Sequence, residues 1–415
     1  MTKNERRVLF FSIAFPFYIL FMWLAISPFP GQLFFAPLTE SGLLKAFRYD
    51  RSNATYSYVL GRLYHYGLEH YDPEKARRYY KESLSLNPLQ GGCWLDLAKA
   101  SETAGSTADA GYAIKRAIRL VPKNPSVRWE AGVFYLNTGD IEASLGNFRE
   151  FVLLQPEKQS AVYDLVWKLR LDARHILDAL VPKTYAYYRK YLSYLVSTER
   201  TNESKDVWNA MKGFEVEDEE FIKYTDFLIS RHLYEDARDI WNDFQKKKTK
   251  PSQENGSAMP WNGSFEEDIV NGGYDWKINE TKGVDVFLDR DTRMLGSRSL
   301  GVTFDGTQNP GVSIASQVVI VRPNTGYVLR GNIKTGSLTT SNGLVLSVEG
   351  HDCKGFYRKS DAVTGTNFWK EVVVEFNTPP ACNAVLISIK REKSTKLDNK
   401  ISGNAWIDGI NMVQK

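Results

Sequence analysis

The sequence is poor in the residues that build metal centres and disulfide frameworks. It has three cysteines and five histidines among 415 residues, which excludes a disulfide-dense scaffold and limits any histidine-rich metal site. It also lacks an excess of either charge, because 53 basic residues face 49 acidic ones and the net charge is +4. Proteins that bind nucleic acid usually concentrate far more basic charge, so no nucleic-acid partner is expected.

Signatures of catalysis are missing as well. The sequence contains no G-x-S-x-G, H-E-x-x-H, C-x-x-C, Walker or dinucleotide-binding fingerprint. His65 and His70 are the closest histidines, and their spacing is poor for one helical face. The acidic run 218–220 lies at the start of a solvated helix, and nothing marks the two facing acids that a glycosidase needs. We therefore predict a protein that is not an enzyme.

Long apolar runs are absent, with one exception. The mean hydropathy of −0.36 excludes a polytopic membrane protein, but Val8–Ile26 carries no charge over 19 residues. A helix of this length covers about 28 Å, close to a bilayer's hydrocarbon core, and Lys3, Arg6 and Arg7 precede it. The pattern predicts a cytoplasmic stub and a transmembrane signal-anchor within residues 1–31, hence a single-pass inner-membrane protein whose bulk is periplasmic or extracellular. A cleaved signal peptide is the alternative.

Proline and small residues recur at a fixed spacing in the N-terminal half. Pro88, Pro122 and Pro156 lie 34 residues apart, as do Gly105 and Gly139. A period of this length is typical of stacked helical hairpins, in which proline ends the second helix. These residues resemble the tetratricopeptide repeat. The resemblance implies five or six hairpins over residues 45–248, forming a solenoid that docks a protein partner.

The character of the sequence changes after the repeats. Residues 249–260 lose all apolar periodicity, which is typical of a solvated linker. From residue 261 to 415, short runs alternate between apolar and polar residues and are separated by turn residues. Seven or eight such runs predict an antiparallel β-sandwich. The expected fold is thus multidomain: a transmembrane helix, an all-α solenoid and a C-terminal all-β sandwich.

Motifs at both ends of the last segment are informative. It opens with Asn262-Gly263-Ser264-Phe265-Glu266, closes with Ile407-Asp408, and carries Pro323-Asn324-Thr325-Gly326-Tyr327 before a predicted strand. These motifs resemble the jelly-roll carbohydrate-binding modules of the galactose-binding-like superfamily. The resemblance implies a polysaccharide ligand and a structural Ca²⁺ held by Glu266 and Asp408, with backbone carbonyls supplying further oxygens. Carboxylates that merely cap turns are the alternative.

Sugar binding needs exposed aromatic rings with polar groups nearby. The candidates for glycan contact are Trp276, Tyr357 and Trp369, although Trp369 and Trp406 also fit core or strand-edge packing. In an exported domain two cysteines can be oxidised, and we predict a disulfide between Cys353 and Cys382. Cys93 lies in a repeat helix, beside a tryptophan, and is expected to be a small buried residue.

The order of the predicted parts leads to a functional hypothesis. We expect a non-catalytic, membrane-anchored envelope protein whose solenoid docks a protein and whose sandwich binds or senses a polysaccharide. The layout resembles bacterial envelope proteins of exopolysaccharide systems, which implies a role in exopolysaccharide assembly or export. Two alternatives stay open: a purely structural protein–protein adaptor, and a glycan-processing enzyme.

Overall fold

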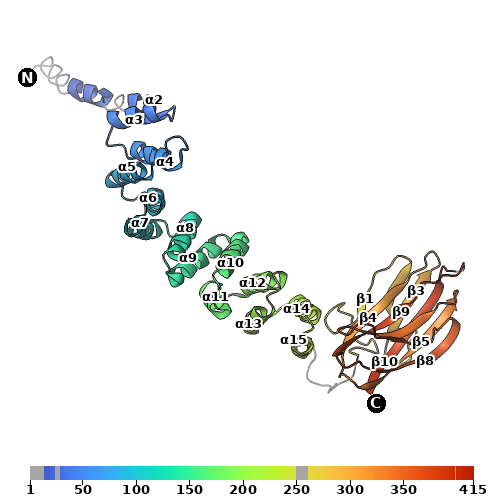
Figure 1. The fold of residues 1–415 in the computed structure, drawn as a ribbon. Helices are drawn as coiled ribbons and strands as arrows, with labels where there is room; N and C mark the ends of the chain where they lie inside the picture. Colours follow the sequence, from blue (N-terminus) through green and yellow to red (C-terminus); the bar gives the residue numbers. More distant parts are fainter. Residues whose placement is uncertain (1–13, 24–28, 249–259, 398) are drawn as a thin grey trace, which may run out of the picture. The chain divides into compact units, whose positions relative to one another are not determined.

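The computed structural model describes residues 14–23, 29–248, 260–397 and 399–415. Helices fill it as far as Lys248, and strands follow from Lys277 (Figure 1). It divides into two compact units, Met1–Ala210 and Met211–Lys415. The second unit therefore contains the last helical hairpin as well as all the strands.

The first unit is a series of helical hairpins. Consecutive helices pack in pairs, α4 on α5, α6 on α7 and α8 on α9, and Pro88 and Pro122 lie just beyond the ends of α5 and α7. The predicted solenoid of hairpins is confirmed. Its helices are α2 Phe29–Phe35, α3 Glu40–Tyr49, α4 Ala54–Tyr66, α5 Pro73–Leu86, α6 Gly91–Thr103, α7 Thr107–Leu120, α8 Pro125–Asn137, α9 Ile141–Leu154, the 3₁₀ turn η1 Pro156–Lys158, α10 Gln159–Trp167, α11 Ala173–Ala179, α12 Tyr185–Ser197 and α13 Thr201–Met211.

Small residues set how closely the paired helices approach. A Cβ atom at Gly61 of α4 would lie 2.5 Å from the ring of Tyr80 on α5. The third repeat is built in the same way, because a Cβ at Gly132 of α8 would lie 2.5 Å from the ring of Phe148 on α9. Each of these two hairpins thus places a buried aromatic ring against a glycine, and this packing explains why small residues recur in the repeat.

The predicted membrane helix is wrong. Residues 8–13 and 24–26 of Val8–Ile26 lie outside the described residues, and residues 14–23 form a helix. Across the part of the chain that the structure describes, every helix is too short or too polar to cross a bilayer. The predicted transmembrane element of the fold is therefore wrong, and so is the predicted single-pass inner-membrane location. The length of the uncharged run decided the prediction, and of that run the structure describes residues 14–23.

The second unit begins with the hairpin of α14 (Asp218–Ser230) and α15 (Tyr234–Lys248). Two five-stranded sheets follow, in the orders β1-β4-β9-β6-β7 and β2-β3-β10-β5-β8; we call them the first and the second sheet. All of their strand pairs are antiparallel, which confirms the predicted β-sandwich. The strands are β1 Lys277–Ile278, β2 Val284–Asp289, β3 Ser299–Asp305, β4 Val312–Ile320, β5 Gly326–Leu338, β6 Leu344–Gly350, β7 Tyr357–Lys359, β8 Gly365–Asn377, β9 Ala384–Arg391 and β10 Ser402–Gln414.

Alternation along the strands fills the space between the sheets. Leu300, Val302 and Phe304 of β3 face Ile387 and Ile389 of β9 in one buried cluster. The residues between them in the sequence point to the outer faces, because successive side chains of a strand point to opposite sides. The outer faces of the two sheets are thus rigid surfaces whose residues are set by strand register. Residues 249–259 of the predicted linker lie outside the described residues.

Candidate binding surfaces

Trp276 belongs to the core of the sandwich. Its side chain is fully buried, its ring packs 5.4 Å from that of Phe265, and its Nε1 donates to the carbonyl of Asn262 at 3.0 Å. The opening motif of the segment therefore wraps around this indole and holds it. The ring has no exposed face on which a sugar could stack.

Tyr357 lies on the outer face of the first sheet, on its edge strand β7. Its hydroxyl donates to Glu392 Oε1 at 3.2 Å, and Lys390 Nζ lies 5.1 Å from the ring centroid. Glu392 also pairs with Lys359 at 2.5 Å. Burial and the Glu392 carboxylate raise the pKa of Tyr357 above its usual value. The surface here is one aromatic ring within a network of paired charges.

Trp369 lies on the outer edge of the second sheet, next to a β-bulge. Ile333 pairs with Lys370 and Thr335 pairs with Asn367, so the register shifts between these pairs. Phe368 and Trp369 on β8 therefore oppose the single residue Lys334 on β5. Phe368 is 92% exposed, which is unusual for a large apolar side chain on a strand.

The bulge extends a row of residues that crosses the second sheet. Trp406 on β10 pairs with Lys334 on one side and with Gly301 on the other. Phe287 on β2 pairs with Gly301 from the opposite side. We call this row the aromatic row; it consists of Phe287, Gly301, Trp406, Lys334 and the pair Phe368–Trp369.

The aromatic row lies on the outer face of the sheet. Ala405 and Ile407, which flank Trp406, belong to the buried core, and so do Leu300 and Val302, which flank Gly301. The side chains of the row must therefore point away from the core. Phe287 is 39% exposed.

Local contacts hold the rings of the row in place. Trp406 Nε1 donates to Asp289 Oδ2 at 2.7 Å, and Lys334 Nζ lies 5.3 Å from the Trp406 ring. A Cβ at Gly301 would lie 2.5 Å from the ring of Phe287, so this ring rests on the glycine. Burial alone would raise the pKa of Asp289, but hydrogen bonds from Asp291, Trp406 and Thr292 outweigh it and lower this pKa.

The sequence analysis named Trp369 as a candidate for glycan contact. It did not predict that Phe287 and Trp406 lie on the same surface as Trp369. The alternating direction of side chains along a strand could have placed Trp406 on this surface. Trp406 stands between two apolar residues of a strand and must point outward if they point inward. The pairing of β2, β3 and β10 that aligns Phe287 with Trp406 is long-range, since β10 lies about a hundred residues after β3. A single sequence does not contain that register.

Glu266 and Asp408 both hold the loop between β2 and β3. Asp408 is fully buried, and its Oδ2 accepts from Met294 and Leu295 N–H at 2.8 Å each. Its Oδ1 is buried and has no hydrogen-bond partner among the described residues. Glu266 accepts from the backbone N–H of Ser297 at 2.9 Å and from its hydroxyl at 2.5 Å.

The electrostatics of the two carboxylates differ. Burial raises the pKa of Asp408, and the negative charge of Glu266 adds to this effect. For Glu266, burial is outweighed by the hydrogen bonds of Ser297 and Arg298, so its pKa is lowered. Asp408 Oδ1, which is buried and has no hydrogen-bond partner among the described residues, is the oxygen that would contact a Ca²⁺ ion. The remaining ligands of a six- to eight-fold shell would be backbone carbonyls and water.

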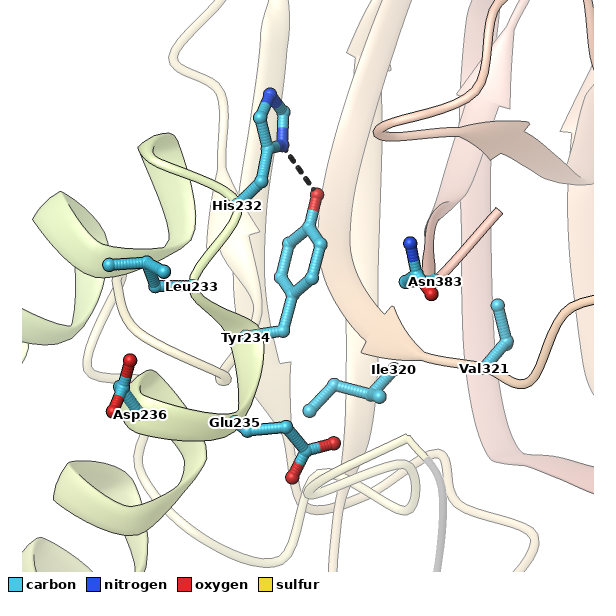
Figure 2. Close-up of a pocket in the computed structure, with 8 residues that line it drawn as sticks. All are labelled: His232, Leu233, Tyr234, Glu235, Asp236, Ile320, Val321 and Asn383. Carbon is cyan, nitrogen blue, oxygen red and sulfur yellow. Dashed lines mark hydrogen bonds between the residues drawn. The ribbon is translucent and has the colours of Figure 1, made fainter. Parts of the chain in front are cut away.

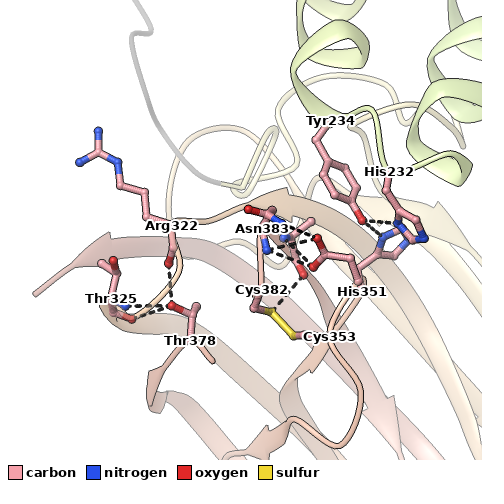
Figure 3. Close-up of a disulfide and its surroundings, with 11 residues drawn as sticks. His232, Tyr234, Arg322, Thr325, His351, Cys353, Thr378, Cys382 and Asn383 are labelled. Carbon is pink, nitrogen blue, oxygen red and sulfur yellow. Dashed lines mark hydrogen bonds between the residues drawn. A yellow bond between two sulfur atoms is a disulfide. The ribbon is translucent and has the colours of Figure 1, made fainter. Parts of the chain in front are cut away.

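A disulfide joins Cys353, between β6 and β7, to Cys382 just before β9 (Figure 3). The carboxylate of Asp352 lies beside both sulfurs, but it accepts from Asn383 N–H at 3.0 Å, and the bonded sulfurs are not thiolate ligands. Next to this loop, Tyr234 Oη lies 2.8 Å from His351 Nδ1 and 2.7 Å from His232 Nδ1. Cys93 is buried in α6, and burial raises the pKa of its thiol to about 12.

A cavity of about 300 Å³ lies between the start of α15 and the end of β4 (Figure 2). Its wall combines apolar Leu233, Ile320 and Val321 with the carboxylates of Glu235 and Asp236. Tyr234 also lines this cavity. Its hydroxyl is hydrogen-bonded to His232, as Figure 2 shows. The cavity is a product of the contact between helix and sheet, and its polar groups do not form a nucleophile–base pair.

In the first unit, the polar surface of two successive hairpins is tied together. Tyr58 and Tyr66 on α4 each donate to the Asp96 carboxylate on α6 at 2.9 Å. The Arg62 guanidinium lies within 6 Å of both tyrosine rings. Burial and Asp96 raise the pKa of both tyrosines. The result is an exposed arginine set between two aromatic rings.

Comparisons with known proteins identify no family. No family model matches the chain. It is 27% identical over 157 residues to the tRNA nuclease WapA of Bacillus subtilis strain 168, a match that covers 36% of this chain and 6% of WapA. The chain therefore spans only a small part of this curated relative, and the similar tRNA(Glu)-specific nuclease WapA of Bacillus subtilis subsp. natto shows the same 27% identity and the same coverage.

Solved structures that match parts of the chain include a MamA protein, a xylan-binding domain and a CBM4 structure. A crystal structure of MamA is 14% identical, with a TM-score of 0.29, and covers 45% of this chain and 88% of its own. The xylan-binding domain CBM22-1 of Paenibacillus barcinonensis Xyn10C is 19% identical, with a TM-score of 0.27, and covers 37% of this chain and 91% of its own. A CBM4 structure is 14% identical, with a TM-score of 0.27, and covers 37% of this chain and 98% of its own.

Proposed function

We propose that this chain is a non-catalytic binding protein whose sandwich binds a polysaccharide and whose helical repeats dock a protein partner. The observation that carries the proposal is the aromatic row on the outer face of the second sheet. Phe287 and Phe368 are exposed there, on strands whose inner faces pack against the core of the sandwich. Exposed apolar surface of this kind, arranged in a line, is typical of a ligand surface.

The chemistry of the row suits a sugar. A pyranose ring has an apolar C–H face that packs on a flat aromatic ring, and hydroxyl groups at its edge that need hydrogen-bond partners. Trp406 supplies such a ring, and Asp289 and Lys334 lie beside it as acceptor and donor. All of these groups stand on paired strands, so little conformational entropy is lost when a ligand binds.

The repeats supply a second surface. Arg62, Tyr58 and Tyr66 combine the residue types that dominate protein interfaces, arginine and tyrosine, in one cluster fixed by Asp96. A solenoid whose repeats contact only their neighbours presents such clusters over an extended surface. We expect the partner to be a protein of a polysaccharide assembly or export system, to which the sandwich would bring the glycan.

Affinity electrophoresis of the full chain through gels that contain polysaccharides tests the sugar-binding half. At least one polysaccharide should retard the wild type, and Trp406→Ala should abolish most of the retardation. Tyr112→Ala is the matched control, because it removes an exposed ring from α7 of the first unit. A folded wild type that migrates unchanged through every gel would contradict the proposal.

A further inference from the structure

A second surface of the helical repeats, outside the proposed function, lies between α5 and α7. We propose that the groove between these two helices binds an acidic segment of a protein partner, which inserts one bulky apolar side chain into it. The apolar lining of the groove, its departure from the repeat pattern and its positive charge point to this ligand.

The groove contains a cavity of about 390 Å³ in the first unit. Trp94 and Leu97 of α6 line it together with Leu84 of α5 and Tyr112 of α7. The first three are buried, but Tyr112 is 60% exposed, and its ring stands edge-on to that of Trp94 at 5.6 Å. The volume is near the lower end of the range for ligand pockets, about 300–1,000 Å³. It therefore suits one side chain of a larger partner.

The groove and the cluster around Arg62 lie on opposite sides of α6. Asp96, which accepts from Tyr58 and Tyr66, follows Trp94 by two residues. Two residues correspond to about 200° around a helix. A partner in the groove would therefore not cover the Arg62 cluster.

The repeat pattern does not require the rings of this groove. The 34-residue period places Arg128 at the position of Trp94 in the next repeat, and Gly146 at the position of Tyr112. The corresponding groove between α7 and α9 thus lacks both rings. A ring needed only for helix packing would recur from repeat to repeat, whereas Tyr112 is exposed and does not recur.

The helices on both sides of the groove are basic. α5 and α7 together carry seven basic and three acidic residues, a net charge of +4. In contrast, α9 carries one basic and two acidic residues. The acid that lines the cavity, Asp109, is already paired with Arg77 at 2.7 Å and with Lys81 at 2.8 Å. The excess charge of the groove is therefore positive.

Three further arginines lie along the groove without an acidic partner among the described residues: Arg78, Arg116 and Arg119. Arg78 precedes Lys81 by three residues, and Arg116 and Arg119 follow Tyr112 by four and seven residues, so they share the helix faces that line the cavity. α5 and α7 run in the same direction because α6 returns between them. Arg78 and Arg119 thus lie toward opposite ends of the groove.

Arg116 joins the positive charge to the apolar lining. Its guanidinium lies 5.4 Å from the ring of Trp94, and its Nε is buried and has no hydrogen-bond partner among the described residues. A guanidinium binds a carboxylate through two parallel N–H donors. The expected segment therefore carries acidic residues on both sides of one large apolar residue.

Fluorescence anisotropy of the full chain with labelled synthetic peptides tests the inference. The probe is a peptide of glutamates with one central leucine. It should bind about tenfold or more tightly than a peptide whose central residue is alanine, because only the leucine fills the cavity. A peptide of lysines with the same leucine should not bind, and salt should weaken binding of the glutamate peptide by screening the charges of the groove.

Paired charge reversals locate the peptide on the groove. The double variant Arg78→Glu, Arg119→Glu should weaken binding of the leucine peptide about tenfold or more. The matched control Lys158→Glu, Lys168→Glu changes the net charge equally at exposed lysines outside the groove, and should bind as the wild type. Tyr112→Ala should remove most of the preference for leucine over alanine. Circular dichroism shows whether each variant is folded.

Four outcomes would overturn the inference. Equal loss of affinity in both charge variants would show that the peptide senses net charge and not the groove. Loss in Arg62→Ala, with full binding in the groove variants, would place the peptide on the other side of α6. Self-association of the chain that Tyr112→Ala abolishes in analytical ultracentrifugation would make the occupant a second copy. The fourth is a wild type that binds no acidic peptide; if polysaccharide gels still retard that chain, sugar binding by the sandwich stands.

Discussion

At the residue scale, two tryptophans of the sandwich show how position decides role. Trp276 stands between Asp275 and Lys277, and Trp406 stands between Ala405 and Ile407. Trp276, with the charged neighbours, is fully buried, whereas Trp406, with the apolar neighbours, lies on the outer face and donates to Asp289. The difference follows from strand phase, because Trp406 is flanked by two core residues. Type of residue alone does not identify a sugar-contacting ring.

The glycines of the repeats provide a first residue-scale prediction. Gly132→Ala should lower the free energy of unfolding by about 1–3 kcal/mol, because the added Cβ would overlap the Phe148 ring. Gly146→Ala on α9 is the matched control: nothing lies within 4 Å of its Cβ position, so it should stabilise by about 0.5–1 kcal/mol. Urea denaturation of both variants measures the difference. Equal stability of the two would contradict the packing described for the third repeat.

The buried carboxylate of Asp408 provides a second prediction at the residue scale. If its free Oδ1 helps to bind Ca²⁺, the ion should stabilise the protein by about 2.7 kcal/mol at a hundredfold excess over its dissociation constant. The melting temperature should then rise with Ca²⁺ and fall with a chelator, and Asp408→Asn should lose the response. Asp361→Asn, at an exposed carboxylate, should keep it. A melting temperature that is independent of Ca²⁺ would leave Glu266 and Asp408 as hydrogen-bond acceptors for the loop.

At the element scale, the contact of α14 and α15 with the sandwich is polar as well as apolar. Asp226 accepts from Gly273 N–H at 2.9 Å and pairs with Lys277 at 2.8 Å. Tyr274 donates to the carbonyl of Tyr234 at 2.8 Å, and Trp241 lies against Gly273. The hairpin therefore contributes to the folded sandwich unit.

At this contact we expect His351 to make the stability of the protein depend on pH. Burial, helped by His232 and Lys277 and opposed by Asp352, lowers the pKa of His351. Because the folded pKa lies below the unfolded value of about 6.5, the contribution of His351 is present above about pH 6.5 and is lost as the pH falls through the folded pKa. Each pKa unit of depression corresponds to about 1.4 kcal/mol.

A variant separates this effect from general acid denaturation. His351→Asn keeps a hydrogen-bonding group near Tyr234 without a titrating ring, so its free energy of unfolding should fall less than that of the wild type between pH 7 and 5. His175→Asn on α11 should follow the wild type. Parallel stability curves for wild type and His351→Asn would show that His351 does not titrate on unfolding.

The disulfide between Cys353 and Cys382 also stabilises the sandwich. It closes a loop of sequence separation 29 between β6 and β9, and the loss of such a cross-link costs about 3–4 kcal/mol in the chain-entropy model. The double variant Cys353→Ser, Cys382→Ser should show this loss in chemical denaturation. Wild type treated with a reductant should match it, whereas a reductant should leave the double variant unchanged.

At the scale of the whole molecule, the boundary between the two units lies within the helices. The split at Ala210 and Met211 assigns α14 and α15 to the sandwich. A fragment of residues 211–415 should therefore melt at a higher temperature than one of residues 261–415, which lacks the partners of Tyr274 and Gly273. Differential scanning calorimetry compares them, and equal melting temperatures would place the boundary after the hairpin instead.

The sequence by itself determined the two kinds of architecture. The 34-residue period and period-two alternation are local patterns, and each is decided by which face of a helix or strand must be buried. The opening and closing motifs predicted a sandwich over residues 261–415, and the strands lie between Lys277 and Gln414. The same local reasoning failed for residues 8–26, where the length of an uncharged run predicted a membrane span that the described helices do not contain.

Only the tertiary structure decided which side chains meet. Phe287, Trp406 and Trp369 lie far apart in the chain, and they form one row because β2, β3, β10, β5 and β8 pair in a particular register. A slip of one residue in any pair would turn a ring toward the core. Register depends on the packing of both sheets together, which is a property of the folded chain and not of any one segment.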